Sequence, residues 1–553
     1  MPRQFLNFIY RESRSLNQAA LLLGFFALLA QILAFLRDRL LAHIFGASSE
    51  LDVYYAAFRV PDFIFVTVAS VVSVSVLVPF IIEKRENLKE FIDNIFSFFA
   101  LLIFAVSAAA WFLMPAINGL LFRGLGSEEL ALSITLSRIL LLSPLILGVS
   151  NLFGSITQAH QRFALYGLAP VLYNAGIIVG ILTLSREVGV VGVVWGVVIG
   201  ALLHAAIQLP FIIKKRLTPG FRRIDWAVIG QVAALSVPRT LTLSMSSLAF
   251  IFLVSYASLM TEGSISVLSF ANNLQSVPLS LIGVSYSLAA FPILSRRFQE
   301  KNLAAFLEQM RTSARFIIFW SLPLATLFIM LRAQIVRVLL GTGEFDWNAT
   351  RLTAAAVALF VVSTVAQSLT LLLMRGFYSA GKTLKPFLIS VFSTGALISL
   401  TYILVKTFYE SENFRYFWGA LLKVEDLPGN AVLMLSLGFS LGTTINMAIL
   451  WYFFEKEFKG LTKGLAKVAF QTFGASVLMG AAAYLGLNFF VKFFDTATLP
   501  GLFLQGFCSW LLAIILGVMV LQALRSCELS EAGQALRGKF WRAKVVATDP
   551  EIV

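Results

Sequence analysis

The chain has 553 residues, of which 58% are hydrophobic and only 13% are charged, and its mean hydropathy is +0.85. Soluble domains carry about 25% charged residues. This composition, with apolar runs of roughly 20 residues recurring along the chain, therefore predicts an all-α polytopic membrane protein and excludes a soluble protein or a membrane β-barrel. The net charge of +14 does not indicate nucleic-acid binding, because the cations lie in short loops between apolar segments.

The apolar segments predict about 14 transmembrane helices. Two sets of six are followed by a pair, which places an N-terminal lobe at 1–213, a basic cytoplasmic linker at 214–226, a C-terminal lobe at 227–456, helices 13 and 14 at 457–524, and a basic cytoplasmic tail at 525–553. The predicted helices are 16–36, 52–82, 91–115, 131–158, 163–185, 188–213, 227–259, 264–294, 312–332, 352–378, 386–408, 430–454, 465–491 and 500–524.

A weak internal repeat supports the two pseudo-symmetric lobes. Residues 264–300 resemble 51–86, since each stretch is a long apolar helix that ends at a proline and a charged turn. Residues 372–388 likewise resemble 155–172, with small and polar residues, a basic turn and then a proline that opens the next helix. Such repeats are typical of transporters.

The distribution of cations predicts that both termini lie on the cytoplasmic side. Lys and Arg gather in alternate connections and at both chain ends, whereas the opposite loops are richer in acids. The acids of those loops include Glu128, Glu129, Glu262, Glu344, Asp346, Glu410 and Glu412.

The charged stretch from Gln31 to Pro79 is the candidate functional centre. Ionisable side chains here fall in or beside two apolar segments, where each charge costs about 2.5–3.5 kcal/mol on insertion scales. Such residues normally face a bundle interior or a water-filled pathway. The residues are Arg37, Asp38, Arg39, Asp52, Arg59 and Asp62.

Each of these residues also has a structural alternative. Arg37 and Asp38 could form an ion pair at a helix end, and Asp52 could cap the second helix. Asn272 and Asn273, in the eighth segment, could serve as hydrogen-bond links between helices.

Several motifs together resemble one family. The runs FLRDRLLAHIFGASSELDVYYAAFRVPD, RILLLSPLILGVSNLFGSITQAHQRFALYGLAPVLYN, GEFDWNATRLTAAAVALF and RGFYSAGKTLKP are similar, in this order, to the MurJ/MviN lipid II flippases of the multidrug/oligosaccharidyl-lipid/polysaccharide exporter superfamily. The resemblance implies two six-helix lobes arranged in a V. It also implies an added helix pair that borders a groove for the lipid tail.

The resemblance also implies a substrate site. Arg37, Asp38, Asp52 and Arg59 match family positions around a cationic cavity that receives a pyrophosphate-linked sugar head group. An arginine offers a diphosphate both charge and a planar fork of donors. The carboxylates would orient the arginines and balance their charge when the site is empty.

The sequence departs from the family at four positions. Gln31, Phe65 and Asn273 stand where further cavity arginines are usual, and Ser70 stands where an acid is usual. Gln31, Asn272 and Asn273 are therefore the amide candidates for substrate binding. The family's sodium site is not recognisable in helix 7, which contains Gln231 and Arg239 and no acid.

We therefore expect a flippase that moves a polyprenyl-diphosphate-linked peptidoglycan precursor, lipid II, across the bacterial inner membrane by alternating access. The alternatives are an exporter of another lipid-linked oligosaccharide or amphiphile, and a transport-incompetent scaffold for envelope assembly. The expected partners are the glycolipid, membrane lipids and cell-wall synthesis proteins, with no nucleic acid, and the expected state is a monomer.

Enzyme activity is not expected. A membrane glycosyltransferase or acyltransferase needs a metal-binding acidic pair, or a catalytic His or Asp in a sizeable polar loop. The loops are short, no Asp-x-Asp motif occurs, and the three histidines stand far apart in the sequence. Two cysteines, Cys508 and Cys527, form no metal-ligand spacing. We expect no metal site and no cofactor.

Overall fold

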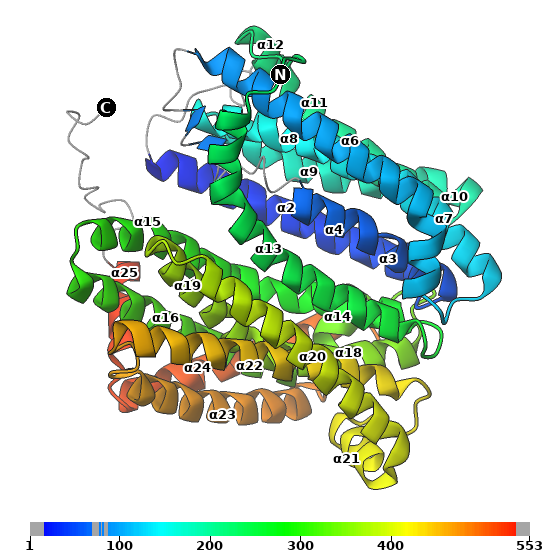
Figure 1. The fold of residues 1–553 in the computed structure, drawn as a ribbon. Coiled ribbons are helices and arrows are strands. Elements are labelled where there is room, and N and C mark those ends of the chain that lie inside the picture. The colour runs from blue at the N-terminus through cyan, green and yellow to red at the C-terminus, as the bar shows by residue number, and fades with distance from the viewer. Residues whose placement is uncertain (1–15, 69–76, 79, 82–86, 538–553) are drawn as a thin grey trace, which may run out of the picture. The chain divides into compact units, whose positions relative to one another are not determined.

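The computed structural model describes residues 16–68, 77–78, 80–81 and 87–537, and all regular elements in these ranges are helices (Figure 1). Ser70, residues 1–15 and the end of the basic tail lie outside the described residues. The helices of the first half are α2 (Leu16–Phe45), α3 (Ser49–Ala57), α4 (Arg59–Val68), α6 (Leu88–Leu121), α7 (Ser127–Leu140), α8 (Leu142–Ala159), α9 (Phe163–Val179), η3 (Gly180–Leu184), α10 (Ser185–Val188), α11 (Val190–Ala206), α12 (Leu209–Lys214) and α13 (Trp226–Ala257). Those of the second half are α14 (Ser264–Pro278), η4 (Leu279–Val284), α15 (Ser285–Gln299), α16 (Leu303–Met330), α17 (Arg332–Leu339), α18 (Trp347–Val362), α19 (Thr364–Ser379), α20 (Leu384–Glu410), α21 (Glu412–Leu422), η5 (Asn430–Val432), α22 (Leu433–Phe458), α23 (Leu465–Phe490), α24 (Leu499–Ala523) and α25 (Cys527–Arg537).

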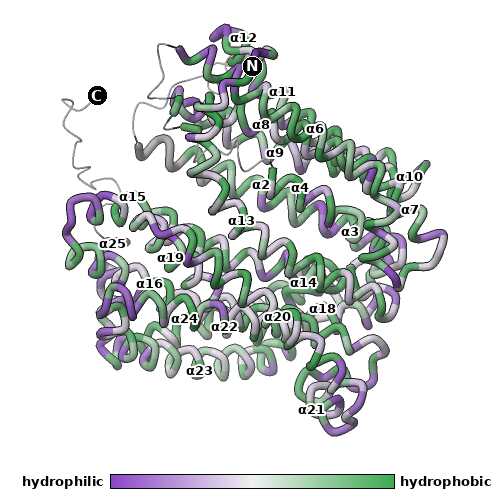
Figure 2. Tube along the Cα trace, viewed as in Figure 1, coloured by the Kyte–Doolittle hydropathy of each residue, from purple (hydrophilic) through white to green (hydrophobic). Residues whose placement is uncertain are grey.

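The predicted class, an all-α polytopic membrane protein, is confirmed. Within the described residues, 11 helices are long and apolar enough to cross a membrane, or 12 if the bent pair α18 and α19 forms one span. The number fourteen stays a prediction. Figure 2 shows the hydrophobic residues along the bodies of the long helices, with hydrophilic residues concentrated at helix ends and loops.

Two helices differ from the predicted ranges in the candidate centre. α2 continues to Phe45, nine residues past the predicted end at 36, because its charged side chains pair with one another and do not stop the helix. The second predicted helix begins at Ser49 and is interrupted at Phe58, three residues before Pro61. A proline inside a helix removes one backbone hydrogen bond and bends the chain there.

The chain folds into two compact units. The first contains 1–272, 339–356 and 383–442, and the second contains 273–338, 357–382 and 443–553. The lobe boundaries expected from the sequence stay a prediction.

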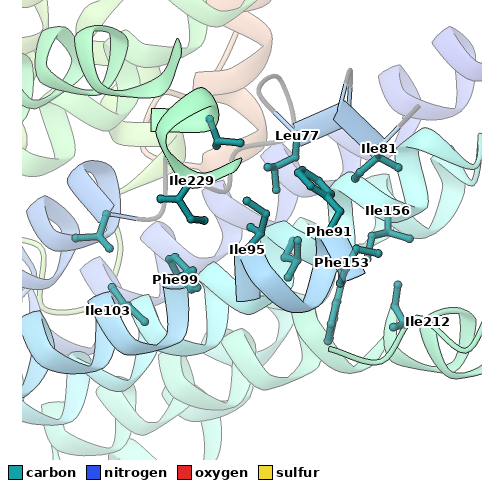
Figure 3. Packing of buried hydrophobic residues seen from close by; sticks show 14 of the residues in the cluster. Leu77, Ile81, Phe91, Ile95, Phe99, Ile103, Phe153, Ile156, Ile212 and Ile229 are labelled. Atoms are coloured by element: carbon teal, nitrogen blue, oxygen red, sulfur yellow. The ribbon is translucent and has the colours of Figure 1, made fainter. Parts of the chain in front are cut away.

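The first unit packs around α6 and α8. Phe91, Ile95 and Phe99 from α6 meet Phe153 and Ile156 from α8 in a buried apolar cluster (Figure 3). Close helix approach depends on glycine elsewhere in this unit. A Cβ on Gly180 would lie 2.4 Å from the Cα of Gly196, so η3 and α11 can touch only because both positions lack a side chain.

The second unit packs α16 against α23 and α23 against α24. Leu327, Met479, Ala483 and Ala513 form a buried cluster between these helices. Its last described helix, α25, is fastened to α16 by Arg315, whose guanidinium lies 2.7 Å from the buried carboxylate of Glu528.

Candidate functional site

Arg37 and Asp38 form the ion pair that was the structural alternative for them, but within α2 and not at a helix end. The Nε and Nη2 atoms of Arg37 both donate to Oδ1 of Asp38, at 2.9 and 2.7 Å. The Asp38 side chain is 8% exposed, whereas the Arg37 side chain keeps 22% of its surface accessible. The carboxylate therefore fixes the guanidinium, and the guanidinium is the exposed member of the pair.

A third residue, Asn174 of α9, completes the support of Arg37. Its Oδ1 accepts from Nη1 of Arg37 at 3.2 Å, and its Nδ2 donates to the carbonyls of Pro170 and Ala30 at 3.1 and 3.4 Å. The amide group thus bonds to both helices, since α2 contributes Ala30 and α9 contributes Pro170. Hydrogen bonds to the amide group hold Arg37 in one orientation.

Two tyrosines of α3 line the same region. Tyr54 and Tyr55 are 3% and 7% exposed, and both lie near Arg37. Tyr55 also lies near Asp38 and Arg59. Its buried hydroxyl has no hydrogen-bond partner among the described residues.

The kink between α3 and α4 is held by a neighbouring helix. Pro61 has no N–H to give to the carbonyl of Ala57, four residues earlier. Ser137 of α7 donates its hydroxyl to that carbonyl at 3.1 Å, and accepts in turn from Asn118 of α6 at 3.1 Å. Ser137 and Asn118 are both fully buried. The free carbonyl is therefore satisfied by tertiary structure, and this fixes the first turn of α4, where Arg59 lies.

Arg59 begins α4 and is partly buried, as Arg37 is. Its Nε donates to the carbonyl of Tyr55 at 2.9 Å, and its guanidinium carbon lies 4.9 Å from the centre of the Phe250 ring. Asp62 interacts with it electrostatically without forming an ion pair. Among the described residues, neither Nη atom of Arg59 has a hydrogen-bond partner. Two donors of a fixed guanidinium are therefore available to an anion.

Asp52 is fully engaged by backbone and hydroxyl donors. Its Oδ1 accepts from the N and Oγ of Ser266 at 2.7 and 2.6 Å, and its Oδ2 accepts from the N of Gly263 at 2.9 Å. The cap of its own helix is Ser48. Asp52 thus meets the N-terminal end of a different helix, α14, where a carboxylate is favoured by the unpaired N–H groups and the helix dipole.

Two of the three amide candidates form no hydrogen bond with this group. Gln31 and Asn272 are partly buried and form no hydrogen bond with other described residues. Asn273 is also partly buried and belongs to the second unit, whereas Asn272 ends the first segment of the first unit. Phe65, which the resemblance sets in the place of an arginine, packs against the apolar cluster around α6.

Glu50 and three of the loop acids, Glu262, Glu344 and Asp346, gather around one cavity of the first unit. Glu50 accepts from the N of Val190, and Glu262 accepts from the N of Ser49, each at 2.8 Å. Together with Asp346 and Glu344 they border a cavity of about 640 Å³. Glu50 and Glu262 therefore join backbone segments that are distant in sequence.

Sequence reasoning missed Asn174, Tyr55 and Ser137. An amide four residues after a proline in an apolar helix was the available signal for Asn174. No pattern indicated Ser137, because its partner Ala57 lies 80 residues away in the chain.

Long apolar helices that carry oriented, partly buried arginines define a multi-pass membrane protein with polar groups within its helices. The family model of the lipid II flippase MurJ matches residues 41–411. The chain belongs to the lipid II flippase MurJ family.

Individual relatives agree with this assignment. The lipid II flippase MurJ of Burkholderia cenocepacia is 24% identical over 496 residues, which cover 86% of this chain and 91% of the relative. A probable lipid II flippase MurJ of Thermotoga maritima is 27% identical over 382 residues, 68% of this chain and 76% of the relative.

Solved structures share the fold. A lipid II flippase MurJ in an inward closed conformation superposes with a TM-score of 0.71 at 21% identity, covering 91% of this chain and 99% of that one. An inward-facing multidrug resistance MATE family transporter of the MOP superfamily gives a TM-score of 0.64 at 19% identity, covering 78% and 96%.

Proposed function

We propose that this protein is a flippase that moves lipid II from the cytoplasmic to the outer leaflet of the bacterial inner membrane by alternating access. Family membership supports the substrate. The observation that carries the site is a pair of oriented guanidiniums on consecutive segments of the first unit: Arg37, fixed by Asp38, and Arg59, whose Nε alone is bonded, with Tyr55 near both.

In this proposal the two arginines have different roles. Arg59 meets the diphosphate first, because its Nη donors have no partner among the described residues. Arg37 is held by Asp38 and Asn174, and it contributes positive charge without having to be ordered when substrate arrives. A preorganised donor loses less conformational entropy on binding. The unpaired hydroxyl of Tyr55 is a further donor for a phosphate or sugar oxygen.

The supporting carboxylates keep the empty site stable. A buried arginine without a counter-ion is strongly disfavoured. Asp38 supplies that counter-ion to Arg37, and Asp62 supplies a partial one to Arg59. Asp52 is proposed to position the site indirectly, because its own acceptors are occupied by Gly263 and Ser266.

The remaining substrate-binding residues are proposed from their positions in the sequence. Gln31, Asn272 and Asn273 would offer amide groups to the sugar, and the polyprenyl tail would remain in lipid beside α23 and α24. Both termini are proposed to face the cytoplasm, in agreement with the distribution of cations. We further propose that the protein works as a monomer, without enzyme activity, alongside cell-wall synthesis proteins.

Complementation tests this function. Bacteria depleted of their own lipid II flippase would express the wild-type chain, Arg37→Ala, Arg59→Ala or the control Arg123→Ala, which changes an exposed loop arginine. We expect rescue by the wild type and the control, and no rescue by the two site variants at equal amounts in the membrane. Failure of well-expressed wild type, or full rescue by Arg37→Ala, would contradict the proposal.

A further inference from the structure

Arg138 of α7 is a second oriented arginine, and it belongs to no part of the site described above. Its Nε donates to the carbonyl of Trp111 in α6 at 3.1 Å, and its guanidinium carbon lies 4.3 Å from the centre of the Trp111 ring. α6 and α7 pack directly against each other (Figure 1). The guanidinium is thus fixed by one hydrogen bond at its Nε and by an aromatic ring on one face.

The carbonyl of Trp111 needs a donor from outside its own helix because of a proline in α6. Pro115 lies inside α6 and has no N–H to give to the carbonyl four residues earlier, which is that of Trp111. Arg138 supplies the missing donor. The adjacent residue, Ser137, does the same for the carbonyl that Pro61 leaves free. Two consecutive residues of α7 therefore satisfy two proline-freed carbonyls on two different helices.

The other donors of Arg138 point to a ligand. Among the described residues, its Nη atoms have no hydrogen-bond partner and no carboxylate pairs with the guanidinium. Its surroundings are apolar and exposed: Trp111 is 44% exposed, Phe112 73% and Leu142 39%. This is the surface that a membrane helix presents to lipid. A lipid-facing cation without a counter-ion is unfavourable unless it reaches the polar head groups.

The position of Arg138 makes that reach possible. α7 begins at Ser127, so Arg138 lies about 16 Å along the helix from that end. Side chains of a helix lean toward its N-terminus, and this direction carries the guanidinium toward the head-group region beside Ser127. Exposed tryptophan and arginine are both typical of that region.

We propose that Arg138 and Trp111 form a binding site for the phosphate of an anionic phospholipid in the leaflet at the Ser127 end of α7. The two free Nη donors match two phosphate oxygens, and the exposed rings of Trp111 and Phe112 contact the upper part of the acyl chains. The bound lipid supplies the counter-ion that the protein lacks there, and it stabilises the contact between α6 and α7.

Photo-crosslinking tests this site in the full-length protein. Purified protein would be reconstituted into vesicles that contain phosphatidylglycerol with a diazirine in its acyl chain, and adducts would be mapped by mass spectrometry. We expect adducts on 104–115 and 131–142 to exceed those on other lipid-facing segments. Excess unlabelled phosphatidylglycerol should displace them, and phosphatidylcholine should not.

Variants then connect the adducts to the residue. Arg138→Gln should reduce the adducts on these two segments about tenfold, the change expected when a charge-assisted hydrogen bond is lost. The matched control Arg123→Gln, at an exposed loop arginine near the same end, should leave them unchanged. Equal adducts in Arg138→Gln would overturn the proposal. Equal displacement by phosphatidylcholine in the wild type would also overturn it, and that result does not depend on the folding of a variant.

Discussion

Ser137→Ala tests whether tertiary structure satisfies the carbonyl that Pro61 leaves free. The substitution removes the hydroxyl that donates to the Ala57 carbonyl and one of two acceptors for the side-chain amide of Asn118. An average interhelical hydrogen bond in a membrane protein contributes only about 0.6 kcal/mol. A buried carbonyl left without a donor costs more, about 1–3 kcal/mol. We therefore expect Ser137→Ala to lower the free energy of unfolding by an amount in the upper part of this range.

A double-mutant cycle separates these two contributions. In a Pro61→Ala background the residue at 61 again has an N–H for the Ala57 carbonyl. There, Ser137→Ala should cost only about 0.5–1 kcal/mol, the loss of the bond to Asn118. The pair should therefore be coupled by about 1–2 kcal/mol. Ser133→Ala, which removes the other acceptor of Asn118, is the control and should not couple with Pro61.

Equilibrium unfolding in mixed micelles containing increasing SDS measures these differences. Equal destabilisation by Ser137→Ala in both backgrounds would show that the carbonyl of Ala57 does not depend on Ser137. The explanation of the kink would then be wrong.

Three further changes test other contacts by measurement of unfolding or docking. Asp52→Asn, which turns an N–H₂ toward donors that now bind a carboxylate, should lower the free energy of unfolding by about 2–3 kcal/mol; an unchanged value would refute the assigned contact. Gly196→Ala would bring a Cβ to 2.7 Å from the η3 backbone and should lower the melting temperature, and a tolerated alanine would contradict the close approach. Burial raises the pKa of the Glu528 carboxyl, but its hydrogen bonds to backbone, Arg315 and Ser526 outweigh burial, so the pKa is lowered. Because the folded pKa is depressed, docking of α25 is fully stabilised above the ordinary glutamate pKa of about 4.3 and is lost as the pH falls further. A spin label on α25 should therefore become mobile in acid, and in Arg315→Gln it should be mobile already at neutral pH. A label that is equally immobile at neutral pH in the wild type and in Arg315→Gln would contradict the role of the Arg315–Glu528 ion pair in docking α25.

The sequence was sufficient for the class of fold because membrane insertion depends on long apolar segments, which are local in sequence. The pairing of Arg37 with Asp38 was predictable for the same reason, since the residues are adjacent. The end of α2 was not predictable, because the charges that suggested a helix end pair with each other inside a helix that continues. α21 was missed as well, because its 11 residues are too few to cross a membrane and the search was for long apolar segments.

The rest of the site depends on tertiary structure. Asn174 reaches Arg37 across 137 positions of sequence, and Asp52 reaches the start of α14 across 211. The position of Asp52 in the first turn of its helix suggested a cap, but the helix that it meets is decided by the packing of distant segments. No single-sequence pattern contains that information.

The measurement that tests the central claim most directly is outward movement of fluorescent lipid II in vesicles containing the purified protein. Arg59→Gln removes the open guanidinium and leaves the ion pair of Arg37 in place. We predict that wild type moves lipid II to the opposite leaflet and that Arg59→Gln does so at least about tenfold more slowly, as loss of a charge-assisted contact with diphosphate requires. Movement at the wild-type rate by folded Arg59→Gln would contradict the account.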